Sequence, residues 1–147
     1  MKKALLLAKE AFEKGEIPVG AVIVRNGEII AEGRNRREEK QNALSHAEIE
    51  AINCACKKLG AWRLDDCEIY VTLEPCPMCM GAILNARLKT VVFGAFDSRA
   101  GSAESVIDLQ NRFELSNPEI FGGICEEECE NLLKDFFVTV RSHGRKE

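Results

Sequence analysis

Two short segments of the sequence carry side chains that could bind a metal ion. His46-Ala47-Glu48 offers an imidazole and a carboxylate, and Cys76-Pro77-Met78-Cys79 offers two thiols. Two thiolates and one imidazole suit zinc, and a set of three protein ligands leaves a fourth position for water. The only other histidine, His143, lies close to the C-terminus and is a poor candidate for a fourth ligand. We therefore predict an open zinc site rather than a closed structural one.

Glu48 can take part in chemistry without binding the metal. Zn²⁺, two thiolates and a neutral imidazole sum to zero formal charge, so a water on the metal could ionise near neutral pH. A carboxylate beside that water can accept its proton and later return it. Taken alone, Glu48 could instead form a capping box with Ser45, and Cys76 with Cys79 could be a redox pair. The presence of both segments together favours a catalytic metal site.

The hydrophobic pattern predicts the elements that position these residues. Apolar spacing predicts helices over residues 2–14, 45–59, 77–86, 105–112 and 124–141. Runs rich in β-branched residues predict strands over residues 19–24, 28–32, 67–73, 88–93 and 119–121. An Asn26-Gly27 turn should join the first two strands as a hairpin. The two metal-binding segments then lie at helix starts, where negative charge on thiolates is stabilised.

This order of elements predicts a layered α/β domain over residues 1–147, with two loops at 33–44 and 95–104. Strands 67–73 and 88–93 should be parallel because a helix joins them. The last predicted helix places an apolar stripe along one face, and we expect this stripe to pack into the core. The stripe consists of Cys125, Cys129, Leu132, Leu133, Phe136, Phe137 and Val140.

Composition excludes several classes of protein. The chain has 147 residues and a formal net charge of −4, which argues against a protein that holds nucleic acid by bulk positive charge. No apolar run is long enough to span a membrane. Lys9 and Glu10 interrupt the N-terminal apolar stretch, so we expect no signal peptide and a cytoplasmic location. Seven cysteines without an export signal also argue against a disulfide framework.

The two segments match the H-x-E…P-C-x-x-C signature of zinc deaminases that act on nucleobases. Over nearly its whole length the chain resembles the tRNA-specific adenosine deaminases of the cytidine deaminase-like superfamily. The further segments that carry the resemblance are residues 16–23, 33–36, 62–64, 70–76, 91–95 and 129–137. The resemblance implies a cytidine deaminase-like, three-layer α-β-α fold with a central mixed five-stranded sheet.

The same resemblance implies an activity, which is hydrolytic deamination of adenosine to inosine at the wobble position of a tRNA anticodon. It implies a homodimer with one Zn²⁺ per subunit, held by His46, Cys76 and Cys79. Zinc-bound hydroxide would attack C6 of adenine, and Glu48 would move the protons. The partner would be the anticodon stem-loop.

The resemblance also assigns residues to substrate binding. Asn35 would contact the base, and backbone groups at Ala47 and Glu74 would help to hold the base and the attacking water. Basic side chains crowd the loop around Asn35, and a deaminase that extrudes one base needs only a small basic rim near its pocket. We expect the RNA contacts to come from Arg34, Arg36, Phe96, Asp97 and Arg99.

Three segments depart from the family pattern and keep alternatives open. They are Ala43-Leu44-Ser45 before the metal-binding histidine, Gly101–Ser105 after the fourth strand, and Asn117-Pro118 near the fifth. Because such loops shape the pocket, the first alternative is a deaminase of a free nucleobase or nucleoside, such as guanine, cytosine or cytidine. The second is a non-catalytic zinc-binding partner subunit, against which Glu48 argues.

Overall fold

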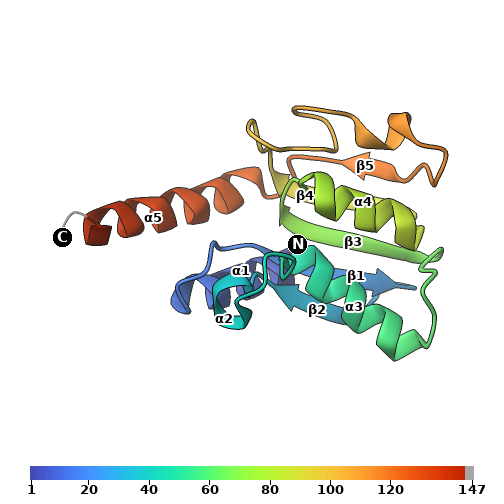
Figure 1. Ribbon diagram of the computed structural model, residues 1–147, viewed down its shortest axis with the longest axis horizontal. Helices are drawn as coiled ribbons and strands as arrows, with labels where there is room; N and C mark the ends of the chain where they lie inside the picture. The colour runs from blue at the N-terminus through green and yellow to red at the C-terminus, as the bar shows by residue number, and fades with distance from the viewer. Residues whose placement is uncertain (145–147) are drawn as a thin grey trace.

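The computed structural model describes residues 1–144 (Figure 1). Its elements in chain order are α1 (Lys2–Glu13), β1 (Gly20–Arg25), β2 (Glu28–Arg34), α2 (Arg37–Lys40), α3 (Ala47–Leu59), β3 (Cys67–Leu73), α4 (Pro77–Ala86), β4 (Thr90–Ala95), the 3₁₀ helix η1 (Leu109–Arg112), β5 (Glu119–Phe121) and α5 (Glu126–Gly144).

The strands form one mixed sheet of five strands in the order β2-β1-β3-β4-β5. Strand β1 runs antiparallel to β2 and β3, and β4 runs parallel to β3 and β5. The predicted hairpin is confirmed, because Asn26 and Gly27 both have positive φ, as a tight two-residue turn requires. The predicted parallel pairing of β3 with β4 across α4 is confirmed as well. The predicted α/β class is therefore correct.

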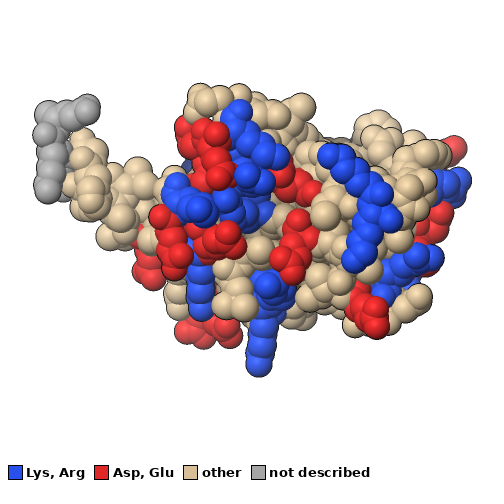
Figure 2. Space-filling model, turned by 90° about the horizontal axis from the view of Figure 1, so that it is seen from below, with Lys and Arg blue, Asp and Glu red and all other residues tan. Residues whose placement is uncertain are grey.

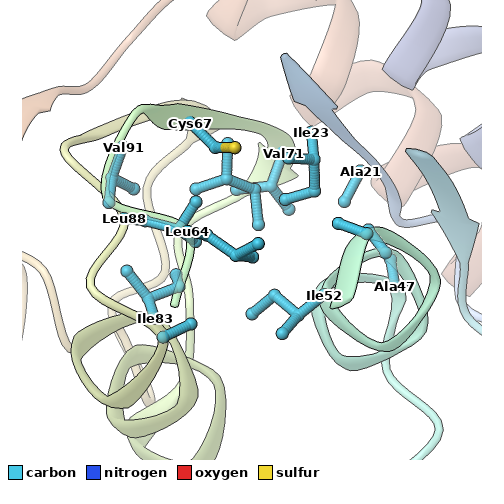
Figure 3. Close-up of a cluster of buried hydrophobic side chains, with 14 of the residues drawn as sticks. Ala21, Ile23, Ala47, Ile52, Leu64, Cys67, Val71, Ile83, Leu88 and Val91 are labelled. Atoms are coloured by element: carbon cyan, nitrogen blue, oxygen red, sulfur yellow. The ribbon is translucent and has the colours of Figure 1, made fainter. Parts of the chain in front are cut away.

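Helices cover both faces of the sheet, which gives the predicted three layers (Figure 1). Alternate residues of the strands, among them Ile23, Val71 and Val91, pack with α3 and α4 in the largest hydrophobic cluster (Figure 3). Helix α1 packs on the opposite face, where the Cβ of an alanine at Gly20 would lie 2.0 Å from the carbonyl oxygen of Ala4. The absence of a side chain at that position lets the α1 backbone approach β1 closely.

Four local predictions differ from the structure. Helix α2 lies within the segment predicted as loop, and η1 replaces a helix predicted from residue 105. Helix α3 begins at Ala47 with His46 as its N-cap, and no side chain caps its first turn, so the alternative of a capping box between Ser45 and Glu48 is wrong. On α5 only Cys129 and Phe136 are buried, and Phe137 is 40% exposed. The rest of the apolar stripe does not pack into the core, because α5 extends beyond the sheet (Figure 1).

Candidate metal centre and substrate cavity

The structure brings the three predicted metal ligands together. His46 is the N-cap of α3, Cys76 is the N-cap of α4, and Cys79 lies in the first turn of α4. The Nδ1 atom of His46 is 3.7 Å from Sγ of Cys76 and 3.5 Å from Sγ of Cys79. One nitrogen or sulfur atom from each residue lies within 4.8 Å of the others. The two helix N-termini thus place one imidazole and two sulfur atoms around a common point.

Electrostatics at this point favour a negatively charged sulfur. Hydrogen bonds from the Cys79 thiol and from His46 lower the pKa of Cys76 to about 4, although burial acts in the opposite direction. The same hydrogen bond, together with burial, raises the pKa of Cys79 above its usual value. The hydrogen bond with Cys76 raises the pKa of His46. Cys76 is therefore the sulfur of this cluster that ionises more readily, and the thiolate is the form that binds a metal.

Glu48 is buried beside these ligands, with 4% of its surface exposed. Burial raises the pKa of its carboxyl group to about 7, despite the lowering effects of its own backbone N–H and of Cys79. A carboxyl group with a pKa near neutrality is suited to both accepting and donating a proton. The position that first suggested a helix-capping role therefore holds a group suited to acid–base chemistry.

A cavity of about 210 Å³ opens beside the predicted metal ligands. This volume is smaller than the roughly 300–1,000 Å³ of sites for drug-sized ligands, so the cavity suits one base-sized group. All three residues predicted to bind substrate line it, namely Asn35, Ala47 and Glu74. Ala47 is the first residue of α3, and the N–H groups of a first helical turn have no acceptor within the helix. The backbone at Ala47 is therefore able to donate to a ligand.

Asn35 is held in place by the backbone of the segments before β1 and after β2. Its Nδ2 donates to the carbonyl of Ile17 at 3.3 Å, and its Oδ1 accepts from the N–H of Arg37 at 3.3 Å. A side-chain amide has two N–H groups and two acceptor lone pairs. Asn35 consequently keeps one donor and one acceptor for a ligand while its orientation stays fixed.

Glu74 lines the cavity, and its side chain also forms hydrogen bonds with the loop after β4. Its carboxylate accepts hydrogen bonds from the backbone N–H groups of Asp97, Ala103, Glu104 and Ser105. Burial alone would raise the pKa of Glu74, but these bonds and one from the Ser105 hydroxyl lower it. Only the backbone of Glu74 was expected to matter, and no sequence motif indicated the side-chain contacts.

The predicted RNA-contacting residues divide into two groups. Asp97 lines the cavity, and Phe96 and Arg99 line an adjoining groove of about 510 Å³. Arg34 and Arg36 line a separate depression and form ion pairs with Glu39. Figure 2 shows basic and acidic side chains interspersed on the face that it presents. The structure therefore brings the loop after β4 to the cavity and leaves these two arginines away from it.

Sequence reasoning missed several residues that line the cavity. Arg37 belongs to the basic loop that the sequence indicated around Asn35, but its place in the cavity wall was not predicted. The other missed residues are apolar or small, namely Ile17, Val19, Leu73 and Ala100. These residues share a location near the predicted site residues. Ile17 and Val19 precede β1, Leu73 ends β3, and Ala100 lies in the loop after β4.

Comparisons with known proteins agree with this geometry. The model of the MafB19-like deaminase family matches residues 1–141. The tRNA-specific adenosine deaminase of Bacillus subtilis is 50% identical over 143 residues, which cover 96% of this chain and 88% of that protein. A solved structure from a study of A-to-I editing by tRNA:A34 deaminases at the wobble position of transfer RNA is 40% identical, with a TM-score of 0.88, and covers 90% of this chain and 97% of that one. The guanine deaminase of Bacillus subtilis is 46% identical, with a TM-score of 0.64, over 80% of this chain and 74% of that one.

Proposed function

Because the chain belongs to the family of tRNA-specific adenosine deaminases, we propose that it converts adenosine to inosine at the wobble position of a tRNA anticodon. The observation that carries this proposal is the buried carboxyl group of Glu48 beside a cluster of two cysteines and one histidine, in the wall of a base-sized cavity. The full-length similarity to tRNA deaminases supports the choice of adenosine in RNA as the substrate.

We propose that His46, Cys76 and Cys79 hold Zn²⁺. The donor set fits this ion, because two sulfur atoms and an imidazole nitrogen converge at two helix N-termini and leave room for a further ligand. Bound zinc supplies Lewis acidity, which lowers the pKa of a coordinated water. The lowered pKa of Cys76 supports metal binding, since thiolates rather than thiols are the ligands.

The chain's own groups perform the proton transfers. Glu48 takes one proton from the attacking water and passes it to a ring nitrogen of the purine. It then takes the remaining proton of the same oxygen, as that oxygen becomes the carbonyl of inosine, and passes it to the amino group, so that the C–N bond breaks and ammonia leaves. Its raised pKa allows both transfers near neutral pH. A non-catalytic metal-binding subunit would have no use for a buried carboxyl group at this position, so the enclosed Glu48 favours an enzyme.

The cavity walls orient the base. Asn35 offers one free donor and one free acceptor to the purine edge, and Ala47, whose N–H has no acceptor within α3, lines the same space. The apolar side chains of Ile17, Val19 and Leu73 exclude water from the faces of the ring. Rigid positioning of this kind lowers the entropic cost of reaching the transition state.

The proposal extends to the assembly and the location of the protein. Following the family resemblance, residues 1–147 would form one deaminase domain that works as a homodimer in the cytoplasm. Within residues 1–144 no helix combines the length and hydropathy needed to cross a membrane. Residues 145–147 lie outside the described part of the chain. Sedimentation of the zinc-loaded protein would test the dimer, and a mass of one chain at micromolar concentration would contradict it.

One experiment separates RNA editing from the deamination of small molecules. Zinc-loaded protein is incubated with an anticodon stem-loop that carries adenosine at the wobble position, and in parallel with free guanine, cytosine, cytidine and adenosine. We expect inosine in the RNA and no ammonia from the free compounds. Ammonia from guanine with unaltered RNA would overturn the proposal in favour of the activity named for the Bacillus subtilis guanine deaminase.

A further inference from the structure

We propose that Glu74 is a positioning residue, whose buried carboxylate holds the loop of residues 96–105 as a wall of the substrate site. The inference deepens the proposed function, because it assigns a determinant of substrate affinity to a side chain that touches neither the metal nor the reacting atoms. It rests on the hydrogen bonds between this carboxylate and the loop.

The carboxylate of Glu74 occupies a concave site built from backbone donors. Its Oε1 accepts from the N–H of Asp97 at 3.1 Å, and its Oε2 accepts from those of Glu104 at 2.8 Å and Ser105 at 2.9 Å. A further N–H from Ala103 reaches Oε2 at 3.2 Å. Successive N–H groups that point inward form an anion-binding nest. Here the protein's own side chain is the anion.

No cation shares this role within the described residues, since Glu74 takes part in none of the ion pairs recorded for residues 1–144. Only 2% of the surface of Glu74 is exposed. A buried charge needs compensation, and here the loop backbone and the Ser105 hydroxyl supply it. The loop conformation and the buried charge therefore stabilise each other.

The loop approaches Glu74 closely at Gly101 and is bonded to the chain beside it. A Cβ on Gly101 would lie 2.4 Å from the carboxyl carbon of Glu74, so only glycine fits there without a shift. The N–H of Ser102 donates to the carbonyl of Pro75 at 2.9 Å, which ties the loop to the residue before Cys76. The segment Gly101–Ser105, which departs from the family pattern, is thus fixed to the end of β3.

The loop that Glu74 holds borders both hollows of the substrate side. Asp97 and Ala100 line the base-sized cavity and also the adjoining groove. Phe96, which is 40% exposed, and Arg99 face the groove alone. Displacing the loop would alter the entrance for the nucleotides around the extruded base, while His46, Cys76 and Glu48 would keep their places on α3 and α4.

Glu74→Gln tests this assignment because it keeps the shape of the side chain and removes its charge. The amide NH₂ cannot accept a hydrogen bond, so the donors around one oxygen position lose their acceptor. We expect KM for the anticodon stem-loop to rise about tenfold or more, as expected for the loss of a hydrogen bond to a charged group. We expect kcat to fall much less and the zinc content to stay at the wild-type level.

Ser105→Ala is the matched second variant, since it removes the hydroxyl donor and leaves every backbone donor in place. It should fold even if Glu74→Gln does not, because Ser105 is exposed. We expect KM to rise by a smaller factor of about two to five, because the charge of Glu74 is retained. An unchanged KM in both folded variants, or in Ser105→Ala if it is the only one to fold, would overturn the proposal. So would a loss of kcat at constant KM.

Hydrogen exchange separates this inference from the proposed function. In Glu74→Gln the amides of Asp97 and residues 103–105 should exchange faster, while those of β3 and α4 should not change. This outcome is expected whatever the substrate is. Wild-type protein that deaminates guanine and not RNA would overturn the proposed function only, whereas unchanged exchange in the loop would overturn the role of Glu74.

Discussion

The Nδ1 atom of His46 lies 3.5 Å from Sγ of Cys79, although 33 positions of sequence and one strand separate the two residues. Each stands at the start of a helix on the same side of the sheet. The contact therefore depends on how closely α3 and α4 pack against the sheet.

Substitution of Glu48 should separate metal binding from catalysis. Glu48→Gln keeps the volume of the side chain and removes its proton-transfer capacity, so kcat for inosine formation should fall by about 10²- to 10⁴-fold. The zinc content should remain one ion per chain. Glu50→Gln is the matched control, because Glu50 lies on the same helix and its carboxylate forms an ion pair with Lys40. Equal activity of the two variants would refute the role given to Glu48.

Removal of the metal should destabilise the fold. Since the ligands join the starts of α3 and α4, a chelator should lower Tm and abolish activity, and added Zn²⁺ should restore both. Cys76→Ser should lack zinc and melt at the lower temperature without any chelator. Cys54→Ser should behave as the wild type, because Cys54 is exposed and lies outside the cluster. A Tm that does not change with zinc would show that metal binding at this site does not stabilise the contact between α3 and α4.

Thiol modification should follow burial and pKa. Burial raises the pKa of Cys67 and of Cys129 to about 11. A raised pKa leaves the thiol protonated below that value, so at pH 8 only about one molecule in a thousand carries the reactive thiolate. Iodoacetamide should therefore modify exposed Cys54 first in the zinc-loaded protein.

Chelation should add a second reactive site. The pKa of Cys76 is about 4 in the metal-free protein, so its sulfur is ionised at pH 8 and gains accessibility once zinc is removed. Mass spectrometry of the modified peptides would follow both sites. Modification of Cys129 ahead of Cys54 would contradict the packing of α5 against the sheet.

Glycine substitutions should test how the sheet positions α3. A Cβ on Gly33 of β2 would lie 2.3 Å from the carbonyl oxygen of Ala47, directly after His46. Gly33→Ala should therefore cost about 1–3 kcal/mol of unfolding free energy and weaken zinc binding. Gly81, inside α4, has nothing within 4 Å of an added Cβ. Gly81→Ala should stabilise the protein by about 0.5–1 kcal/mol. Denaturant unfolding should show a lower unfolding free energy for Gly33→Ala and a higher one for Gly81→Ala. A similar loss of stability in both variants would contradict the close approach of α3 to β2.

The sequence predicted what depends on local pattern and on side-chain chemistry. The parallel pairing of β3 with β4 and the meeting of His46 with Cys76 and Cys79 follow from periodicity and ligand type. The contacts of Glu74 could not be predicted, because its donors lie 23 to 31 positions away and are backbone groups with no residue signature. The helix predicted from residue 105 is absent because the segment before η1 forms turns, in which the N–H groups of Val106 and Ile107 both donate to the carbonyl of Gly101.

Arg34 and Arg36 were predicted as RNA contacts from the density of basic residues around Asn35, and that density does not distinguish a free arginine from a paired one. Arg34 has 10% of its side chain exposed and lies within 3.5 Å of carboxylates from both Glu10 and Glu39. Its charge is thus largely neutralised inside the protein. Arg99 is exposed and borders the groove beside the cavity. The position in the fold, rather than the density of charge in the sequence, favours Arg99 as the residue that meets the phosphate backbone.

Arg99→Ala should therefore weaken binding of the anticodon stem-loop and reduce its dependence on salt. Each lost contact with a single-stranded phosphate should make the slope of log K against log salt shallower by about 0.7. Arg63→Ala is the matched control, because it removes the same charge from an exposed arginine just before β3, at the opposite end of that strand from the cavity. Affinities measured at three or more salt concentrations would decide between the two. Equal slopes for Arg99→Ala and Arg63→Ala would mean that the groove does not contact RNA phosphate, because a change in net charge alone affects both variants equally.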